Sequence, residues 1–217
     1  LLPCYFLLKL SKVTIYIINV IYWIQWNYGS KYNGMKKYTH ITLVGNVSID
    51  YDYKGCDKLG DIVVSGDISM PLNAKFSITN SEPELQRMIN NINLKNSTIL
   101  TPLTLYKKYL FFNNVDYLPS FPDLQKLHID IDRCSTQLLS LLCSIWCEYD
   151  KVFLFGYNIE DLNERELLIR TAANNPHVQI YYCRKPNANK IKLFDHLSNV
   201  SVMDFNEFKK YAEEHTE

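Results

Sequence analysis

From residue 40 onward, short continuous apolar runs alternate with segments in which apolar residues recur at helical spacing. Continuous runs are typical of strands buried on both faces, and spacings of three and four residues indicate amphipathic helices. The runs predict strands at 40–45, 61–65, 75–79, 96–101, 126–131, 151–156, 177–183 and 200–203. The helical spacing predicts helices at 82–93, 135–149, 162–174 and 189–197, and from Asp204 to about 215. Residues 103–125 hold an aromatic cluster that fits a lid or a packed loop.

Strands that alternate with helices favour parallel pairing, because each helix supplies the crossover between two strands. We therefore expect an α/β protein, a Rossmann-like three-layer sandwich with a mostly parallel sheet. No repeat or linker divides residues 35–217, which we interpret as a single domain. Such sheets bind ligands at the carboxyl ends of their strands, so residues that follow the strands are the first candidates for a site.

The first 34 residues form an apolar extension with a different pattern. Residues 13–30 carry no charge, and these eighteen residues just reach the length of a transmembrane helix. Asn19 and Gln25 interrupt the stretch, and Met35 precedes the first predicted strand closely. Three interpretations stay open: a membrane anchor, a peripheral helix or strand, and an upstream stretch read in frame before a start at Met35. We expect a cytoplasmic protein, or a membrane-anchored one if residues 13–30 are an anchor.

Composition narrows the classes of protein. The chain has 217 residues, 47% of them hydrophobic, and its 23 basic side chains balance 23 acidic ones. This composition disfavours disorder over most of the chain and argues against a polybasic nucleic-acid binder, so no nucleic-acid partner is expected. Six cysteines in a chain of this length are too few for a disulfide scaffold.

Two predicted strands end in candidate ligand-binding residues. Gly45 and Asn46 follow the strand at 40–45, where a glycine lets the backbone approach a ligand and the amide offers donors and an acceptor. Asp67 follows the strand at 61–65, and its carboxylate can accept a ribose or sugar hydroxyl. A plain turn at Gly45 and a capping role for Asp67 are the alternatives.

A third segment combines a helix start with a strand end. Ser135 and Thr136 begin the helix at 135–149, where N–H groups and the helix dipole favour an anion such as phosphate. Gly156, Tyr157 and Asn158 follow the strand at 151–156, so both sets face the same edge of the sheet. Simple N-capping is the alternative role for Ser135.

The order of these segments resembles sialyltransferase-type glycosyltransferases, family 29 and its bacterial and phage-like relatives. The first motif of that family, a strand with V-G-N-S followed by a glycine and an acidic stretch, is similar to LVGNVS at 43–48, Gly55 or Gly60, and 61–67. The second motif, P-S-T-G with an apolar helix and a strand ending in G-F, is similar to 135–158.

The resemblance implies a metal-free enzyme without a cofactor that binds a CMP-sugar donor and passes the sugar, for example sialic acid, to a glycan acceptor. It implies that Asn46 and Asp67 contact the nucleotide, and that Ser135 and Thr136 contact its phosphate or sugar. The chain departs from the family pattern at Gln137, where the family has glycine, and the catalytic histidine has no clear match.

A second resemblance concerns 153–183, which is similar to the C-terminal part of SIR2-like and AbiH-like defence proteins. There a buried strand ends in a turn with glycine and aspartate, as Gly156 and Asp161 do here. This alternative implies binding of NAD or another nucleotide. A nucleotide-binding module without catalysis is the third alternative.

His128 and Asp130 are the remaining candidates for catalysis. If 126–131 is a strand, His128, Asp130 and Asp132 share one face and could act as an acid–base or metal cluster. A solvated strand end is the alternative. Cys143 and Cys147 share a helix face, for which core packing is the preferred interpretation over zinc, so no metal is expected.

Overall fold

The computed structural model of the protein describes residues 40–45, 56–67, 73–121, 124, 129–186 and 194–216. They belong to one compact unit that spans 38–217. The extension 1–34, Asn46 and His128 lie outside the described residues, as does most of the helix predicted at 189–197. None of the helices in the described ranges combines the length and the apolar character needed to cross a membrane.

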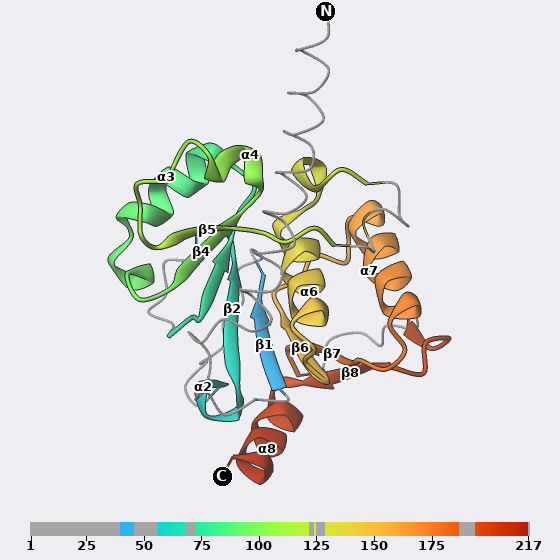
Figure 1. The fold of residues 1–217 in the computed structure, drawn as a ribbon. Helices are drawn as coiled ribbons and strands as arrows, with labels where there is room; N and C mark the ends of the chain where they lie inside the picture. Colours follow the sequence, from blue (N-terminus) through green and yellow to red (C-terminus); the bar gives the residue numbers. More distant parts are fainter. Residues whose placement is uncertain are drawn as a thin grey trace, which may run out of the picture. The chain divides into compact units, whose positions relative to one another are not determined.

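The described residues form one sheet of eight strands in the order β5-β4-β3-β2-β1-β6-β7-β8, and every neighbouring pair is parallel. The predicted α/β Rossmann-like architecture is therefore confirmed (Figure 1). The strands are β1 (His40–Val44), β2 (Asp61–Ser65), β3 (Phe76–Ile78), β4 (Thr98–Thr101), β5 (Val115–Tyr117), β6 (Lys151–Phe155), β7 (Gln179–Arg184) and β8 (Val200–Asp204).

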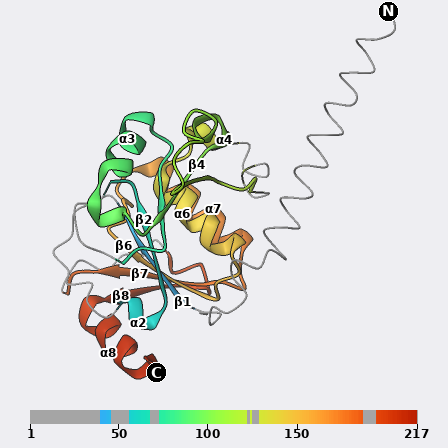
Figure 2. The same ribbon diagram turned by 60° about the vertical axis from the view of Figure 1, so that its left-hand side comes forward.

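Helices cover both faces of this sheet (Figures 1 and 2). One hydrophobic cluster joins the sheet to α6 and α7, and another joins the opposite face to α2 and α8. The helices are α2 (Cys56–Leu59), α3 (Glu82–Asn90), α4 (Leu103–Tyr106), α6 (Thr136–Trp146), α7 (Leu162–Asn174) and α8 (Phe205–His215), with 3-10 turns at Ile92–Leu94 and Ile131–Arg133. The layers are thus helix, sheet and helix.

Strand β6 shows why central strands read as continuous apolar runs. Val152 and Leu154 belong to the cluster on the α6 side, whereas Phe153 and Phe155 belong to the cluster on the α8 side. All four side chains are fully buried, because a central strand of a doubly covered sheet has no solvated face.

The strand predicted at 126–131 is wrong in its described part. Asp130 is exposed, and its carboxylate accepts a hydrogen bond of 3.2 Å from the backbone N of Asp132. Asp130 is thereby the N-cap of the 3-10 turn Ile131–Arg133. Short acidic side chains bond to nearby backbone in this way and compete with strand formation. The expected acid–base face of His128, Asp130 and Asp132 therefore has no strand to carry it from residue 129 onward.

Strand β5 was missed because its three residues do not form an apolar run. It lies at the edge of the sheet, inside the aromatic segment 103–125, where its sequence Val-Asp-Tyr has no distinctive period. Helix α4 within the same segment is also short. Strand β3 is equally short, but Phe76 and Ile78 give the segment predicted at 75–79 its apolar positions.

His40, at the start of β1, makes part of the stability of the fold depend on pH. Its Nε2 lies 2.9 Å from the Tyr211 hydroxyl of α8. Burial, followed by the charges of Lys151 and His215, lowers the pKa of His40 below its usual 6.5, while Asp150 acts weakly in the opposite direction. The unfolded chain therefore takes up this proton first, and stability is lost as pH falls from 6.5 through the lowered pKa of folded His40.

We expect the urea midpoint to decrease between pH 7 and about 5.5, and this decrease to be smaller in His40→Gln. Urea titrations at both pH values measure it. His177→Gln, at an exposed turn, is the matched control and should keep the wild-type dependence. An unchanged slope in His40→Gln would contradict the assignment.

Candidate functional site

The strand order places a topological switch point between β1 and β6. The chain leaves β1 towards β2 on one side, and it leaves β6 towards β7 on the other. Connections that diverge in this way open a crevice at the carboxyl ends of the two strands, which is where open α/β sheets bind their ligands. Gly45 and Gly156 stand directly at those two carboxyl ends.

Gly45 is required by close backbone approach. Its N donates a hydrogen bond of 2.6 Å to the carbonyl of Phe155. A Cβ at Gly45 would lie 2.3 Å from the carbonyl oxygen of Gly156 and 2.9 Å from Nε2 of Gln137. Gly45 therefore lets the carboxyl ends of β1 and β6 lie close together. This is more than the plain turn that was the alternative for this residue.

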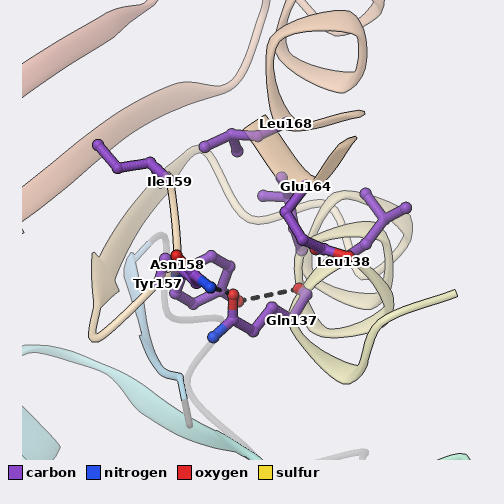
Figure 3. Close-up of a pocket in the computed structure, with 8 residues that line it drawn as sticks. Gln137, Leu138, Tyr157, Asn158, Ile159, Glu164 and Leu168 are labelled. Atoms are coloured by element: carbon purple, nitrogen blue, oxygen red, sulfur yellow. Dashed lines mark hydrogen bonds between the residues drawn. The ribbon is translucent and has the colours of Figure 1, made fainter. Parts of the chain in front are cut away.

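Gln137 of α6 occupies the space between the two strand ends (Figure 3). Its buried side chain donates from Nε2 to the Gly156 carbonyl at 3.2 Å and accepts at Oε1 from the backbone N of Asn158 at 3.0 Å. The Tyr157 hydroxyl donates to the Gln137 carbonyl at 3.1 Å. The residue that departs from the sialyltransferase pattern therefore ties the start of α6 to the loop after β6.

Tyr157 has its ring and its hydroxyl inside the protein. Burial raises the pKa of this phenol well above its usual value, so the hydroxyl stays protonated and donates to α6. The side chain of Tyr157 therefore packs the α6 side of the sheet, while the neighbouring Asn158 is exposed at the edge.

Ser135 is the N-cap of α6 and has a second partner. Its hydroxyl oxygen accepts from the backbone N of Leu138 at 3.1 Å, and the hydroxyl donates to the carboxylate of Glu164 on α7. Asp161 caps α7 by accepting from the backbone N of Asn163 and of Glu164, at 2.9 and 3.0 Å. The N-terminal turns of both helices therefore meet at this edge, and Glu164 supplies the anion beside α6.

Glu164 is a residue of the candidate site that the sequence predictions do not include. The structure makes it half-buried and directs it at Ser135, 29 residues earlier in the chain. The charge of Glu164 also acts on Cys134. Burial is the main cause that raises the pKa of the Cys134 thiol to about 12, and the negative charges of Glu164 and Asp130 add to it. One signal in the sequence could have identified it. Glu164 is the third residue of α7, directly after the N-cap Asp161, and therefore belongs to the first turn of a helix.

A small pocket lies between the starts of α6 and α7 and the loop after β6 (Figure 3). Its cavity volume is about 10 Å³, which is about the space of one water molecule. Its lining consists of Gln137, Leu138, Leu141, Tyr157, Asn158, Ile159, Glu164 and Leu168. A nucleotide base does not fit inside it, so a ligand of that size must lie over the edge or displace part of the lining.

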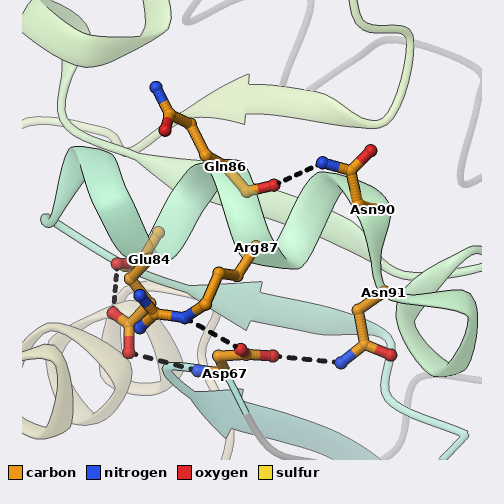
Figure 4. Close-up of polar contacts among 7 residues, drawn as sticks. Asp67, Glu84, Gln86, Arg87, Asn90 and Asn91 are labelled. Atoms are coloured by element: carbon orange, nitrogen blue, oxygen red, sulfur yellow. Dashed lines mark hydrogen bonds and ion pairs between the residues drawn. The ribbon is translucent and has the colours of Figure 1, made fainter.

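Asp67 follows β2, the neighbour of β1, and contacts α3 (Figure 4). Its carboxylate accepts from Arg87 Nε at 3.3 Å and from Asn91 Nδ2 at 3.0 Å. Its backbone N donates to Glu84 Oε1 at 3.2 Å, after a turn in which Gly66 has φ +85°. The side chain is 23% exposed, so its position is fixed while it remains accessible to a ligand hydroxyl.

The candidates divide into two groups. Gly45, Ser135, Gly156 and Asn158 converge at the switch point, together with Thr136, which begins α6. Asp67 stands one strand further along the same edge. In the described part of the chain, no group of three or more His, Cys, Asp or Glu side chains is arranged to hold a metal ion.

No family model matches this chain, and neither the curated proteins nor the solved structures contain a match to it. The resemblance to sialyltransferases stays a prediction from the sequence.

Proposed function

We propose that this protein binds a nucleotide over the carboxyl ends of β1 and β6 and transfers a sugar from a CMP-sugar to a glycan acceptor. The observation that carries the proposal is the convergence of Gly45, Asn158 and the Ser135 end of α6 at a topological switch point. Helix N-termini at such a point favour phosphate, through their N–H groups and the helix dipole.

Each part of a nucleotide has a candidate partner in this arrangement. Ser135 and the first turn of α6 suit the phosphate. Asp67 suits a ribose hydroxyl, since it stands 22 residues after Gly45 at the end of the next strand. An acid about 20 residues after the first glycine holds the ribose in dinucleotide-binding sheets, which supports nucleotides in general and keeps NAD as an alternative ligand.

Sugar transfer by direct displacement requires a base for the acceptor hydroxyl. The acceptor oxygen attacks the anomeric carbon, the bond from that carbon to the phosphate oxygen breaks, and CMP leaves with the electron pair. Glu164 is the carboxylate that contacts Ser135, and we assign it the acceptor proton.

Glu164 and a phosphate compete for Ser135. In the structure the carboxylate holds the hydroxyl, so a bound phosphate must displace it. Displacement by the donor phosphate then frees Glu164 to act as a base on the acceptor hydroxyl. A neutral residue at position 164 should therefore strengthen phosphate binding and, at the same time, remove the base for the acceptor hydroxyl.

Glu164→Gln is therefore expected to bind CMP about tenfold more tightly and to lose sugar transfer. Removing one negative charge beside a helix N-terminus is worth roughly 1–2 kcal/mol to an anion placed there. Calorimetric titration of the full chain with CMP measures affinity, and release of CMP from CMP-sialic acid in the presence of glycan measures transfer. Glu166→Gln, which loses only an exposed pair with Arg170, is the matched control and should change neither.

Ser135→Ala should weaken CMP binding about tenfold, since a hydrogen bond to a charged group is lost. Titrations with UDP-sugars and NAD complete the experiment. Binding of NAD without CMP would replace the transferase proposal by the NAD alternative, and absence of binding to all of these nucleotides would contradict the site itself.

A further inference from the structure

Three consecutive apolar side chains stand in solvent in the turn between α4 and β5. Leu110 is 55% exposed, Phe111 is 94% exposed and Phe112 is 43% exposed. We call residues 110–112 the apolar tip. Single exposed apolar residues are common, but adjacent large ones indicate a surface that is covered by something else.

The apolar tip has an ordered base. The Tyr109 hydroxyl donates to Glu82 of α3 at 3.3 Å and accepts from Gln86 at 2.9 Å. The ring of Phe112 lies 6.0 Å from that of Tyr109, and the backbone N of Phe112 donates to the Tyr109 carbonyl. Because α3 holds this base, the exposure of Phe111 is a built feature of the surface.

Lysine and tyrosine side chains surround the base of the apolar tip. Lys107 and Lys108 precede the apolar tip and are both exposed, and Lys108 lies 2.7 Å from Glu82. Tyr106 packs against Tyr117 with ring centroids 5.4 Å apart. Lysines and tyrosines that flank exposed Leu and Phe suit the level of lipid headgroups, with the apolar side chains below it.

We propose that the apolar tip inserts into the surface of a bilayer that contains anionic phospholipid. Lys107 supplies the charge that is complementary to such a surface. Leu110 and Phe111 supply apolar area in an exposed turn, and a bilayer can receive consecutive side chains without a matching groove. The proposal is independent of the nucleotide site.

The test uses the full chain with Trp23, Trp26 and Trp146 replaced by Phe, so that Phe111→Trp supplies the one tryptophan. The control variant below is made in the same chain, and the vesicles contain phosphatidylcholine with or without phosphatidylserine. Lipids brominated on their acyl chains should quench the new tryptophan in vesicles that contain phosphatidylserine. Leu162→Trp is the matched control, since Leu162 is 65% exposed on α7 on the β6 side of the sheet and should not be quenched. This local readout separates the apolar tip from any lipid binding by residues 13–30.

Flotation with the same vesicles measures how strongly each variant partitions onto the membrane. Phe111→Ser should lower partition about tenfold or more, and Lys107→Gln about fivefold with phosphatidylserine only. Equal quenching of both tryptophans, or no quenching of Trp at position 111, would overturn the proposal. Concentration-dependent sedimentation that Phe111→Ser abolishes would overturn it in favour of a second copy of this chain.

Discussion

Phe153→Ala is expected to lower the free energy of unfolding by about 4 kcal/mol. Phe153 is fully buried in the middle of β6. Its ring stacks on Tyr181 at 4.8 Å and meets Phe208 edge-on at 5.1 Å, so it joins the sheet to α8. Alanine loses the transfer free energy of the ring and leaves a cavity that a close-packed sheet cannot collapse around.

Urea unfolding followed by circular dichroism measures this loss. Phe111→Ala removes the same ring from a side chain that is 94% exposed, so it should change stability by less than about 0.5 kcal/mol. The matched pair separates burial from residue type. Equal losses in the two variants would show that the aromatic cluster of α8 and the sheet does not carry the stability assigned to it.

Gly45→Ala is expected to cost about 3 kcal/mol and to abolish nucleotide binding. The added Cβ would meet the Gly156 carbonyl at 2.3 Å, and this obstacle is backbone that cannot rotate away. The carboxyl ends of β1 and β6 must then separate, which also displaces Gln137 and the start of α6. The melting temperature and a CMP titration below it measure the two effects.

Gly60→Ala is the matched control for the site. Its Cβ would lie 2.1 Å from the His40 carbonyl, so stability should fall by a similar amount. This contact is at the amino ends of β1 and β2, whereas the candidate site is at the carboxyl ends of the strands. The folded fraction of Gly60→Ala should therefore keep its affinity for CMP, and a wild-type melting temperature for Gly45→Ala would contradict the proposed contact.

Long elements with a clear period could be predicted from the sequence closely. The helix predicted at 162–174 has those limits in the structure, and Asp204 caps α8 with a capping box that includes Glu207. These features are local, because a helix bonds to itself within four residues and its cap lies next to it. The predicted helix 135–149 is shorter, since α6 ends at Trp146.

The candidate site could be predicted only as far as its position on the sheet. Gly45, Asp67, Ser135 and Gly156 were identified because each stands at the end of a strand or the start of a helix. Their partners were not: Glu164 for Ser135, Arg87 and Asn91 for Asp67, and Gln137 for Gly156. Each partner is distant in the chain from the candidate that it contacts, and the sequence pattern does not indicate which residues will meet.

The apolar and polar pattern by itself determined that this protein is an α/β sandwich with a parallel sheet, because buried strands and amphipathic helices are properties of single segments. The order of the strands, and with it the switch point between β1 and β6, was decided only in the tertiary structure. So was the contact of Glu164 with Ser135, since a side chain finds a partner 29 residues away only after α6 and α7 have packed on the sheet.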